Sequence, residues 1–298
     1  MKIIEKLRTI LNFLWLGVNT CVCSFFFYIV LLIPILIHRS DIHGRGQLLL
    51  TRIAETWIQG NAWFISKINH LQMPQLSLLR TNKQKSYLVI SNHKSWVDIF
   101  ILQWALKDKI PFLRFFIKDS LKWIPLLGGA WKALGFPFMK RFSKQELLKK
   151  PWLKDLDLKQ TQESCQMLKG IPSSLLIFLE GTRATTSKIA KDKIFRHLLK
   201  PKTSGLATAL DCLGSDVECI VDITLVYQDK PTFLNFLAGR LKNFQVMART
   251  IQIPEKFRGQ QIMSNPILRQ EFDRWIFSIW TEKDLWMTQQ LANHLTAY

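Results

Sequence analysis

Apolar and polar positions alternate along this 298-residue chain in blocks that predict strands and helices in turn. A short apolar run at residues 87–91 predicts a buried strand, and the amphipathic stretch at 96–107 predicts the helix that follows it. Further strands are predicted at 111–117, 135–140, 174–179, 219–227 and 245–253, and further helices at 119–134, 154–169 and 266–291. Strands that alternate with helices are typical of α/β proteins, so the pattern predicts a mixed, largely parallel sheet flanked by helices.

The N-terminal pattern is different, because no charged residue occurs between Leu11 and Ile37. About 27 mostly apolar residues can cross a hydrocarbon layer of about 30 Å with some tilt. Basic residues on both sides leave the orientation open, and Pro34 also allows a segment that lies in the membrane plane or re-enters it. We therefore predict a membrane-anchoring helical segment at residues 1–40, a helical connector at 41–83 and a globular domain at 84–298.

The charge of the chain indicates what kind of partner it has. The formal net charge of +19 points to a polyanion, which is either nucleic acid or an anionic membrane surface. The hydrophobic fraction of 48% and the 12% of aromatic residues exclude a disordered basic protein. The apolar N-terminus favours a lipid bilayer with anionic lipids, and no nucleic acid is expected. The five cysteines have no metal-binding spacing with histidine and suggest no disulfide framework, which fits a reducing compartment.

Two side chains with acid–base chemistry follow the strand at 87–91. His93 lies in the polar break after this strand, and Asp98 lies at the start of the next helix. With His93 on the turn and Asp98 in the first helical turn, the carboxylate can hold the imidazole in one tautomer, as a general base requires. A purely structural role fits the spacing equally well, because Ser95 and Asp98 have the form of a helix cap.

A second polar motif, residues Glu180, Gly181, Thr182 and Arg183, follows the strand predicted at 174–179. The glycine permits a sharp turn or the close approach of a ligand, and the arginine offers a fork that matches phosphate oxygens. Glu180 would repel a phosphate unless it is paired, and it could instead accept a hydrogen bond or orient an arginine. Taken alone, a glycine turn with one surface salt bridge explains the motif as well.

The HxxxxD spacing of His93 and Asp98, followed by the EGTR sequence at 180–183, resembles the glycerolipid acyltransferase family, typified by lysophosphatidic acid acyltransferases. The similarity extends over about residues 84–290. The segments 221–227 and 280–284 further resemble the subgroup that contains the lysocardiolipin acyltransferases and their bacterial relatives.

The resemblance implies roles for further residues of this chain. Residues 180–183 together with Arg141 would bind the phosphate of the acyl acceptor, although Lys140 stands where the family often has an acid. Asn92 and Lys118 are candidates for supporting the acceptor site or its loops. No metal and no bound cofactor is required.

The implied reaction moves a fatty acyl chain from acyl-CoA, or from an acyl carrier protein thioester, to the free hydroxyl of a lysophospholipid. The expected acceptor is 1-acylglycerol-3-phosphate. His93 would be the general base and Asp98 the orienting acid, and backbone N–H groups at the start of the helix are candidates for stabilising the oxyanion. Because the donor is cytosolic, the catalytic domain is expected on the cytoplasmic side of a membrane, most simply the bacterial inner membrane.

Other functions stay open at this point. The basic residues between Arg183 and Lys202 could steer acyl-CoA or hold the domain on anionic lipid, and a solvated lysine-rich loop is the plain alternative. The chain could also be a phospholipid-remodelling acyltransferase or a transacylase that acts on another lysophospholipid. The third alternative is a basic membrane adaptor without enzymatic activity. The oligomeric state is not predicted.

Overall fold

The computed structural model describes residues 2–37, 43–72, 74, 76–139, 146, 149–150, 152–259 and 261–295. Its centre is a five-stranded sheet of order β2-β5-β1-β6-β7. The strands are β1 (Ser86–Ser91), β2 (Leu113–Phe115), β5 (Ser174–Phe178), β6 (Val217–Tyr227) and β7 (Phe244–Ile251). All neighbouring pairs are parallel except β6 and β7, which are antiparallel. The predicted mixed, largely parallel sheet is confirmed.

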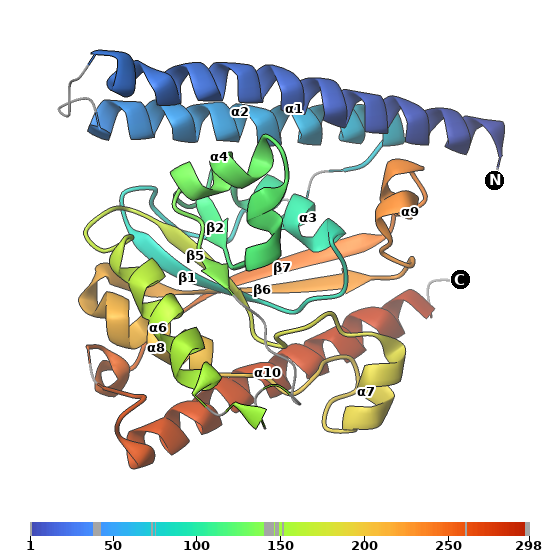
Figure 1. Cartoon of the computed structure of the whole chain (residues 1–298). Coiled ribbons are helices and arrows are strands. Elements are labelled where there is room, and N and C mark those ends of the chain that lie inside the picture. The colour runs from blue at the N-terminus through green and yellow to red at the C-terminus, as the bar shows by residue number, and fades with distance from the viewer. Residues whose placement is uncertain are drawn as a thin grey trace.

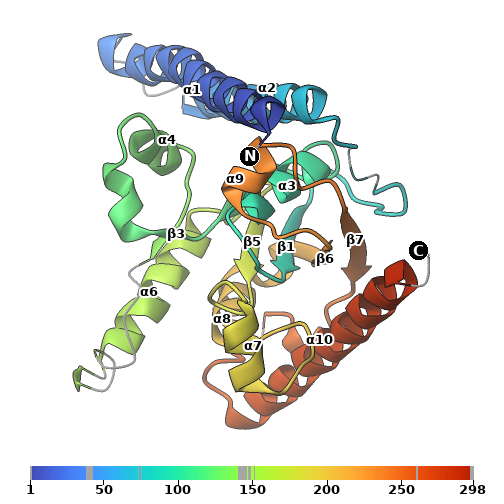
Figure 2. The same ribbon diagram turned by 90° about the vertical axis from the view of Figure 1, so that its right-hand side faces the viewer.

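Helices cover both faces of this sheet (Figures 1 and 2). One face carries α6 (Leu153–Gln166), α8 (Ser204–Leu213) and α10 (Pro266–Leu295); the other carries α2 (His43–Asn69), α3 (Val97–Leu106) and α9 (Phe233–Leu237). Side chains of β1 alternate between the two cores: Leu88 and Ile90 join the first, and Tyr87 and Val89 the second. A strand that is buried on both faces has apolar residues throughout, as this central strand does.

The segment between α3 and α6 is less regular than its sequence pattern predicts. The helix expected at 119–134 is split into a 3₁₀ turn (Asp119–Trp123) and α4 (Leu127–Ala133). Pro125 lacks an N–H group and Leu126 has a φ of +65°, so the helix cannot continue through them. The strands expected at 111–117 and 135–140 shorten to β2 and to the small pair β3 (Ile117–Lys118) and β4 (Phe138–Met139).

The N-terminal helix α1 (Ile3–Ile37) and α2 form an antiparallel hairpin along one side of the domain (Figure 1). Hydrogen bonds join the two helices, for example from Asn19 Nδ2 to the carbonyl of Trp57 at 2.9 Å. In the described part of the chain, α1 alone is long and apolar enough to cross a membrane, and only 11% of its most apolar window is buried. Its outward face is mostly apolar, with Lys6 exposed in the first turns, and includes Ile3, Leu7, Phe13, Leu14, Val18, Val22, Phe25, Phe26, Ile29 and Leu32.

Three short helices were not predicted. They are α7 (Thr186–Asp192), α8 and α9. Helices α7 and α9 have seven and five residues, which is too short for a clear helical period in the sequence, whereas α8 has ten residues, as many as α3. Two of them, α7 and α8, lie between β5 and β6, and α7 follows the EGTR residues directly.

Candidate functional site

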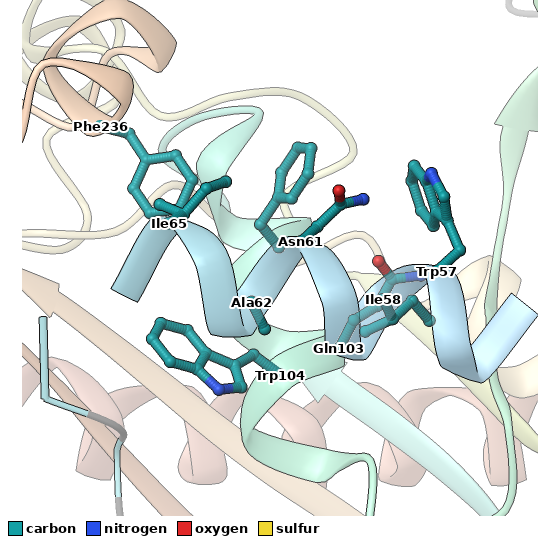
Figure 3. A pocket seen from close by; sticks show the side chains of 9 residues that line it. Trp57, Ile58, Asn61, Ala62, Ile65, Gln103, Trp104 and Phe236 are labelled. Carbon is teal, nitrogen blue, oxygen red and sulfur yellow. The ribbon is translucent and has the colours of Figure 1, made fainter. Parts of the chain in front are cut away.

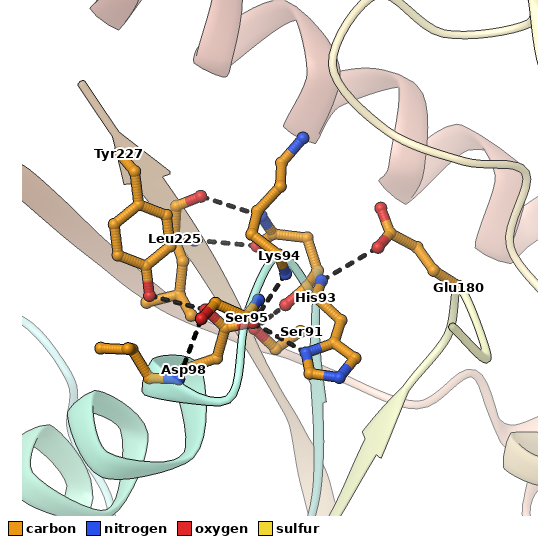
Figure 4. Close-up of polar contacts among 10 residues, drawn as sticks. Ser91, His93, Lys94, Ser95, Asp98, Glu180, Leu225 and Tyr227 are labelled. Atoms are coloured by element: carbon orange, nitrogen blue, oxygen red, sulfur yellow. Dashed lines mark hydrogen bonds and ion pairs between the residues drawn. The ribbon is translucent and has the colours of Figure 1, made fainter. Parts of the chain in front are cut away.

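The candidate site lies where three neighbouring strands end. His93 comes two residues after β1, Glu180 two residues after β5, and Tyr227 is the last residue of β6. Because β1, β5 and β6 are parallel, their carboxyl ends meet at one edge of the sheet. In open α/β sheets ligands bind outside this edge. Figure 4 shows the side chains of Asp98 and Tyr227 on one side of His93 and Glu180 on the other.

His93 and Asp98 are in direct contact. The imidazole Nδ1 lies 2.7 Å from the carboxylate Oδ2, with Asp98 fully buried and the His93 side chain 14% exposed. The carboxylate keeps a proton on Nδ1 and therefore leaves Nε2 free to accept one. The imidazole also stacks on the ring of Phe178 with centroids 4.0 Å apart. An oriented histidine of this kind can act as a general base.

Asp98 also has a structural role, in the turn that precedes α3 and not as a side-chain cap of that helix. Its Oδ2 also accepts the backbone N–H groups of Lys94 at 2.6 Å and Ser95 at 2.9 Å, so the carboxylate fixes the turn as well as the histidine. Because these two N–H groups already bind Asp98, they are not available to stabilise an oxyanion, and that predicted role would need other backbone N–H groups.

The Tyr227 hydroxyl donates to Oδ1 of Asp98 at 2.7 Å, and burial together with the adjacent carboxylate raises the pKa of this phenol. Sequence reasoning did not identify Tyr227, which the sequence shows only as the end of a strand.

Glu180 binds the turn at residues 92–95, which holds His93, and is turned away from solvent. Its side chain is 1% exposed; Oε2 accepts the backbone N–H of His93 at 3.0 Å, and Oε1 accepts that of Leu199 at 3.2 Å. The prediction that residues 180–183 bind phosphate as a group therefore applies less well to Glu180. Its carboxylate joins the backbone at His93 to the backbone at Leu199. Burial raises the pKa of Glu180 to about 7, although the two N–H donors and the nearby Lys94 oppose the shift.

The raised pKa predicts how Glu180 affects stability. A group whose pKa is higher in the folded state contributes stability below its unfolded pKa, and this contribution is lost as pH rises through the folded value. We expect the free energy of unfolding of the wild type, relative to Glu180→Gln, to fall by about 1.4 kcal/mol per pH unit between about pH 5 and pH 7. Denaturant unfolding of both proteins across this range measures it. A difference that stays constant with pH would show that Glu180 is ionised throughout.

The remaining residues of the EGTR motif lie in an exposed turn surrounded by cations. Gly181 has a φ of +64°, and a β-carbon there would come within 3.0 Å of the Lys202 side chain. Lys188 Nζ donates to Thr182 Oγ1 at 2.7 Å, and the Arg183 guanidinium lies 5.7 Å from the Trp96 ring. Lys202 was noted only as part of a basic run, and its place beside Gly181 could not be read from the sequence.

The other predicted site residues have different surroundings. The Asn92 side-chain amide donates to the Leu225 carbonyl and accepts the Leu225 N–H, both at 2.8 Å, so it fastens the turn at 92–95 to β6. Lys118 is exposed in β3, which pairs with β4 and not with the main sheet. Arg141 lies outside the described residues. Among the described residues no group of three or more His, Cys, Asp or Glu side chains could hold a metal ion.

Helix α10 binds the segment 195–199, which in turn contacts Lys94 next to His93. Asp284 accepts the backbone N–H groups of Arg196 and His197 at 2.9 and 2.8 Å. The carbonyl of His197 accepts a 2.6 Å hydrogen bond from Lys94 Nζ, whose pKa is lowered by burial. The indole of Trp280 donates to the carbonyl of Leu199 at 3.0 Å. The block 280–284 therefore holds the segment that contacts the turn at 92–95.

This chain resembles several known proteins. The family model "Acyltransferase" matches residues 70–227. The chain is similar to 1-acyl-sn-glycerol-3-phosphate acyltransferase epsilon of Mus musculus, with 28% identity over 180 residues, 56% of this chain and 47% of that protein. It is also similar to the gamma enzyme of Homo sapiens, with 26% identity over 226 residues, 70% of this chain and 54% of that protein. The chain thus spans about half the length of these relatives.

A solved structure shares the fold. It is that of the 1-acyl-sn-glycerophosphate (LPA) acyltransferase PlsC from Thermotoga maritima, which superposes with a TM-score of 0.53 over 92% of this chain and 97% of that one. The sequence identity is 16%, so this likeness concerns the fold alone.

Proposed function

Because the chain belongs to the acyltransferase family, we propose that it is a lysophospholipid acyltransferase. It transfers a fatty acyl chain from acyl-CoA to the free hydroxyl of 1-acylglycerol-3-phosphate and releases phosphatidic acid and coenzyme A. The observation that carries this proposal is the 2.7 Å contact between His93 Nδ1 and Asp98 Oδ2 at the edge where the EGTR turn also lies. The relatives are 1-acyl-sn-glycerol-3-phosphate acyltransferases, which supports this acceptor, and an acyl carrier protein thioester is the alternative donor.

The proposed mechanism uses the free nitrogen of His93. Nε2 accepts the proton of the acceptor hydroxyl while the hydroxyl oxygen attacks the thioester carbonyl. Asp98 stabilises the imidazolium that forms, as the acid does in a serine-protease triad. When the tetrahedral intermediate collapses, the C–S bond breaks and the imidazolium returns its proton to the leaving thiolate. The nucleophile belongs to the substrate, so no acyl-enzyme is needed.

The exposed turn at Gly181 is the proposed site for the acceptor phosphate. Arg183 and Lys202 are exposed cations on either side of it, and Thr182 adds a hydroxyl. Backbone N–H groups can approach an anion closely at a glycine with positive φ. Arg141 remains a predicted contributor.

Two small, mostly apolar pockets lie under the α1–α2 hairpin. Helix α3 begins next to Asp98, and its Phe100, Gln103 and Trp104 line a pocket against α2 that Figure 3 shows. A second pocket shares Gln103 and continues between α1, α2 and α4 toward Phe112 and Phe136. We propose that acyl chains enter this apolar seam under the hairpin by parting its helices, because the two pockets, at about 10 and 60 Å³, are smaller than an acyl chain.

The hairpin is the proposed membrane contact, and α1 is proposed to lie in the membrane plane. The catalytic domain contacts α1 near both ends, through the ion pair of Glu5 with Arg240 at 2.6 Å and the bond of Tyr28 Oη to the Leu126 carbonyl at 2.8 Å. These two contacts are about 35 Å apart along the helix, which exceeds the hydrocarbon thickness of about 30 Å. A spanning α1 would therefore draw the polar domain into the hydrocarbon, whereas an in-plane α1 buries only its apolar outer face.

This arrangement predicts a membrane-binding defect for charges on the outer face of α1. Leu14 and Val18 are 58% and 57% exposed there. Burying one such side chain contributes about 1.5–3 kcal/mol, so Leu14→Lys/Val18→Lys should lower partition into anionic vesicles at least about 100-fold. Vesicle sedimentation of the purified protein measures this. Leu78→Lys, which changes a 91% exposed residue in a loop, is the control and should bind as the wild type does.

The orientation has its own test. An N-terminal tag on membrane-inserted protein should be cleaved by protease from the side that carries the catalytic domain. Cleavage only from the opposite side would mean that α1 crosses the bilayer.

The proposed activity is tested by supplying the membrane-bound protein with oleoyl-CoA and a panel of lysophospholipids. Preferred conversion of 1-acylglycerol-3-phosphate supports the proposal. Preference for another head group makes the protein a phospholipid-remodelling acyltransferase, and conversion only from a phospholipid donor makes it a transacylase. No product from any donor, in membranes that contain folded protein, would favour the basic adaptor.

A further inference from the structure

A surface next to the active site carries an unusual density of positive charge. Between residues 183 and 202 there are seven cationic side chains, all exposed, and these form the basic segment: Arg183, Lys188, Lys191, Lys193, Arg196, Lys200 and Lys202. Its only acid is Asp192, so seven positive charges and one negative charge give a formal charge of +6. No acidic side chain of the described residues forms an ion pair with any of the seven. Uncompensated charge of this density attracts a polyanion.

The basic segment is attached directly to the turn at 92–95. The backbone N–H of Ala184 donates to the carbonyl of His93 at 2.7 Å, and α7 begins two residues later. Lys191 and Lys193 lie at the end of α7, where Asp192 accepts the backbone N–H of Lys200 at 2.7 Å. The outer cations are Lys191, Arg196 and Lys200, which lie outside the EGTR turn, whereas Arg183 belongs to that turn and Lys202 lies beside Gly181.

The position of α7 argues against a membrane as the partner. In Figures 1 and 2 the α1–α2 hairpin lies at the top of the molecule and α7 at the bottom, with the sheet between them. The two views differ by a rotation about the vertical, so this separation is real in space. A bilayer that contacts the apolar face of α1 leaves α7 in water, and the cations around α7 therefore face a soluble polyanion.

From this geometry we infer that the outer cations bind the phosphate groups of the nucleotide part of a coenzyme A thioester. This inference rests on the proposed acyltransferase function and assigns its donor. The donor has an apolar acyl end, a reactive thioester and a polyphosphate end joined by a long flexible arm. The molecule offers an apolar seam under the hairpin, His93 at the sheet edge and the basic segment on the far side, in the same order. Arg and Lys are the usual protein partners of phosphate.

The variant Lys191→Gln/Arg196→Gln/Lys200→Gln tests the inference. We expect the KM for oleoyl-CoA to rise at least about tenfold, since charge steering and phosphate contacts are lost, while kcat and the KM for the acceptor stay near wild type. The matched control, Lys83→Gln/Lys85→Gln/Lys169→Gln, removes the same charge from exposed lysines that precede β1 and β5. This control should leave all three constants unchanged. An unchanged KM for oleoyl-CoA in the first variant overturns the inference, and so does a rise only in the KM for the acceptor.

A donor without the 3′-phosphate makes the test specific for the nucleotide. Oleoyl-dephospho-CoA should show a raised KM with the wild type and little further change with the triple variant. Equal KM values of the wild type for both donors would overturn the inference. Turnover with acyl carrier protein thioester alone would also overturn it, but would leave the acyltransferase proposal intact. Calorimetric titration of coenzyme A itself into both proteins needs no turnover. Binding that is lost in the triple variant supports the site even where transfer to every acceptor fails, and equal binding overturns it.

Discussion

Replacing His93 by alanine is expected to lower kcat by about 10²–10⁴-fold, the usual contribution of a general base, with little effect on folding. The imidazole is the only group of the site that has one nitrogen bound to a buried carboxylate and the other available to substrate. Its side chain is partly exposed, so truncation removes the base without leaving a deep cavity. Acyl transfer from oleoyl-CoA, measured with protein amounts matched by immunoblot, gives the comparison.

Substitutions of the residues that contact Asp98 or His93 should lower kcat by smaller, graded amounts. Asp98→Asn replaces an oxygen that accepts up to three hydrogen bonds by a group that donates, so it favours the wrong imidazole tautomer and should cost nearly as much as the loss of the base. Tyr227→Phe removes one hydrogen bond to the buried carboxylate, which is worth about 1.5–3 kcal/mol. Its kcat should therefore lie between those of the wild type and Asp98→Asn.

The control for this series is Asp108→Asn, which changes a 68% exposed carboxylate just beyond α3 and should leave kcat unchanged. Activity of His93→Ala within a few fold of the wild type would remove His93 from the proposed mechanism. If all site variants lost both their activity and their circular dichroism signal, the loss of activity would instead reflect unfolding.

Much of this site could be anticipated from the sequence because its chemistry is local. His93 and Asp98 lie five residues apart around one strand–helix turn, and the EGTR turn follows another buried strand. Short apolar runs that end in polar breaks predict such turns well, and the parallel arrangement then brings the turns to one edge.

The supports of the site could not be anticipated, because they come from distant parts of the chain. Tyr227 contacts Asp98 over 129 residues, and Asp284 binds His197 over 87. Nothing in the residues around Glu180 indicates that its carboxylate turns inward to a backbone N–H 87 residues away. Such contacts depend on the register of β6 against β1 and on how α10 crosses the sheet, and hydrophobic periodicity contains neither.

The same limit applies to the hairpin. Apolar length predicts that residues 11–37 contact lipid, but a spanning helix and an in-plane helix have the same composition. The distinction comes from Glu5 and Tyr28, which bind the domain near opposite ends of α1.

The largest effect on stability is expected from Asp222→Asn. Asp222 in β6 and Lys283 in α10 are both fully buried, with Oδ1 and Nζ 2.6 Å apart, and Arg249 reaches the other carboxylate oxygen at 3.0 Å. Breaking a buried ion pair by removing one partner costs about 3–5 kcal/mol, because the remaining charge is left without compensation. Asp222→Asn should therefore lower the free energy of unfolding by about this amount, as measured by urea unfolding in detergent.

The partner substitutions separate charge from packing. Lys283→Met should cost less than Asp222→Asn, since Arg249 still neutralises the carboxylate, and the double variant Asp222→Asn/Lys283→Met should recover part of the loss. Glu282→Gln, which changes a 61% exposed partner of Arg249, is the control and should cost at most about 1 kcal/mol. An Asp222→Asn protein as stable as this control would mean that the pair contributes nothing.

The pH dependence of Asp222→Asn identifies the cause of its instability. Burial already lowers the pKa of Lys283 in the wild type, and the nearby Asp222 carboxylate opposes this shift. Without that carboxylate the folded protein should bind the lysine proton still more weakly than the unfolded chain does. Stability rises with pH wherever the unfolded state binds more protons, so the deficit of Asp222→Asn should shrink as pH is raised toward the usual lysine range. A deficit that is the same at every pH would point to lost packing between β6 and α10, because a void does not titrate.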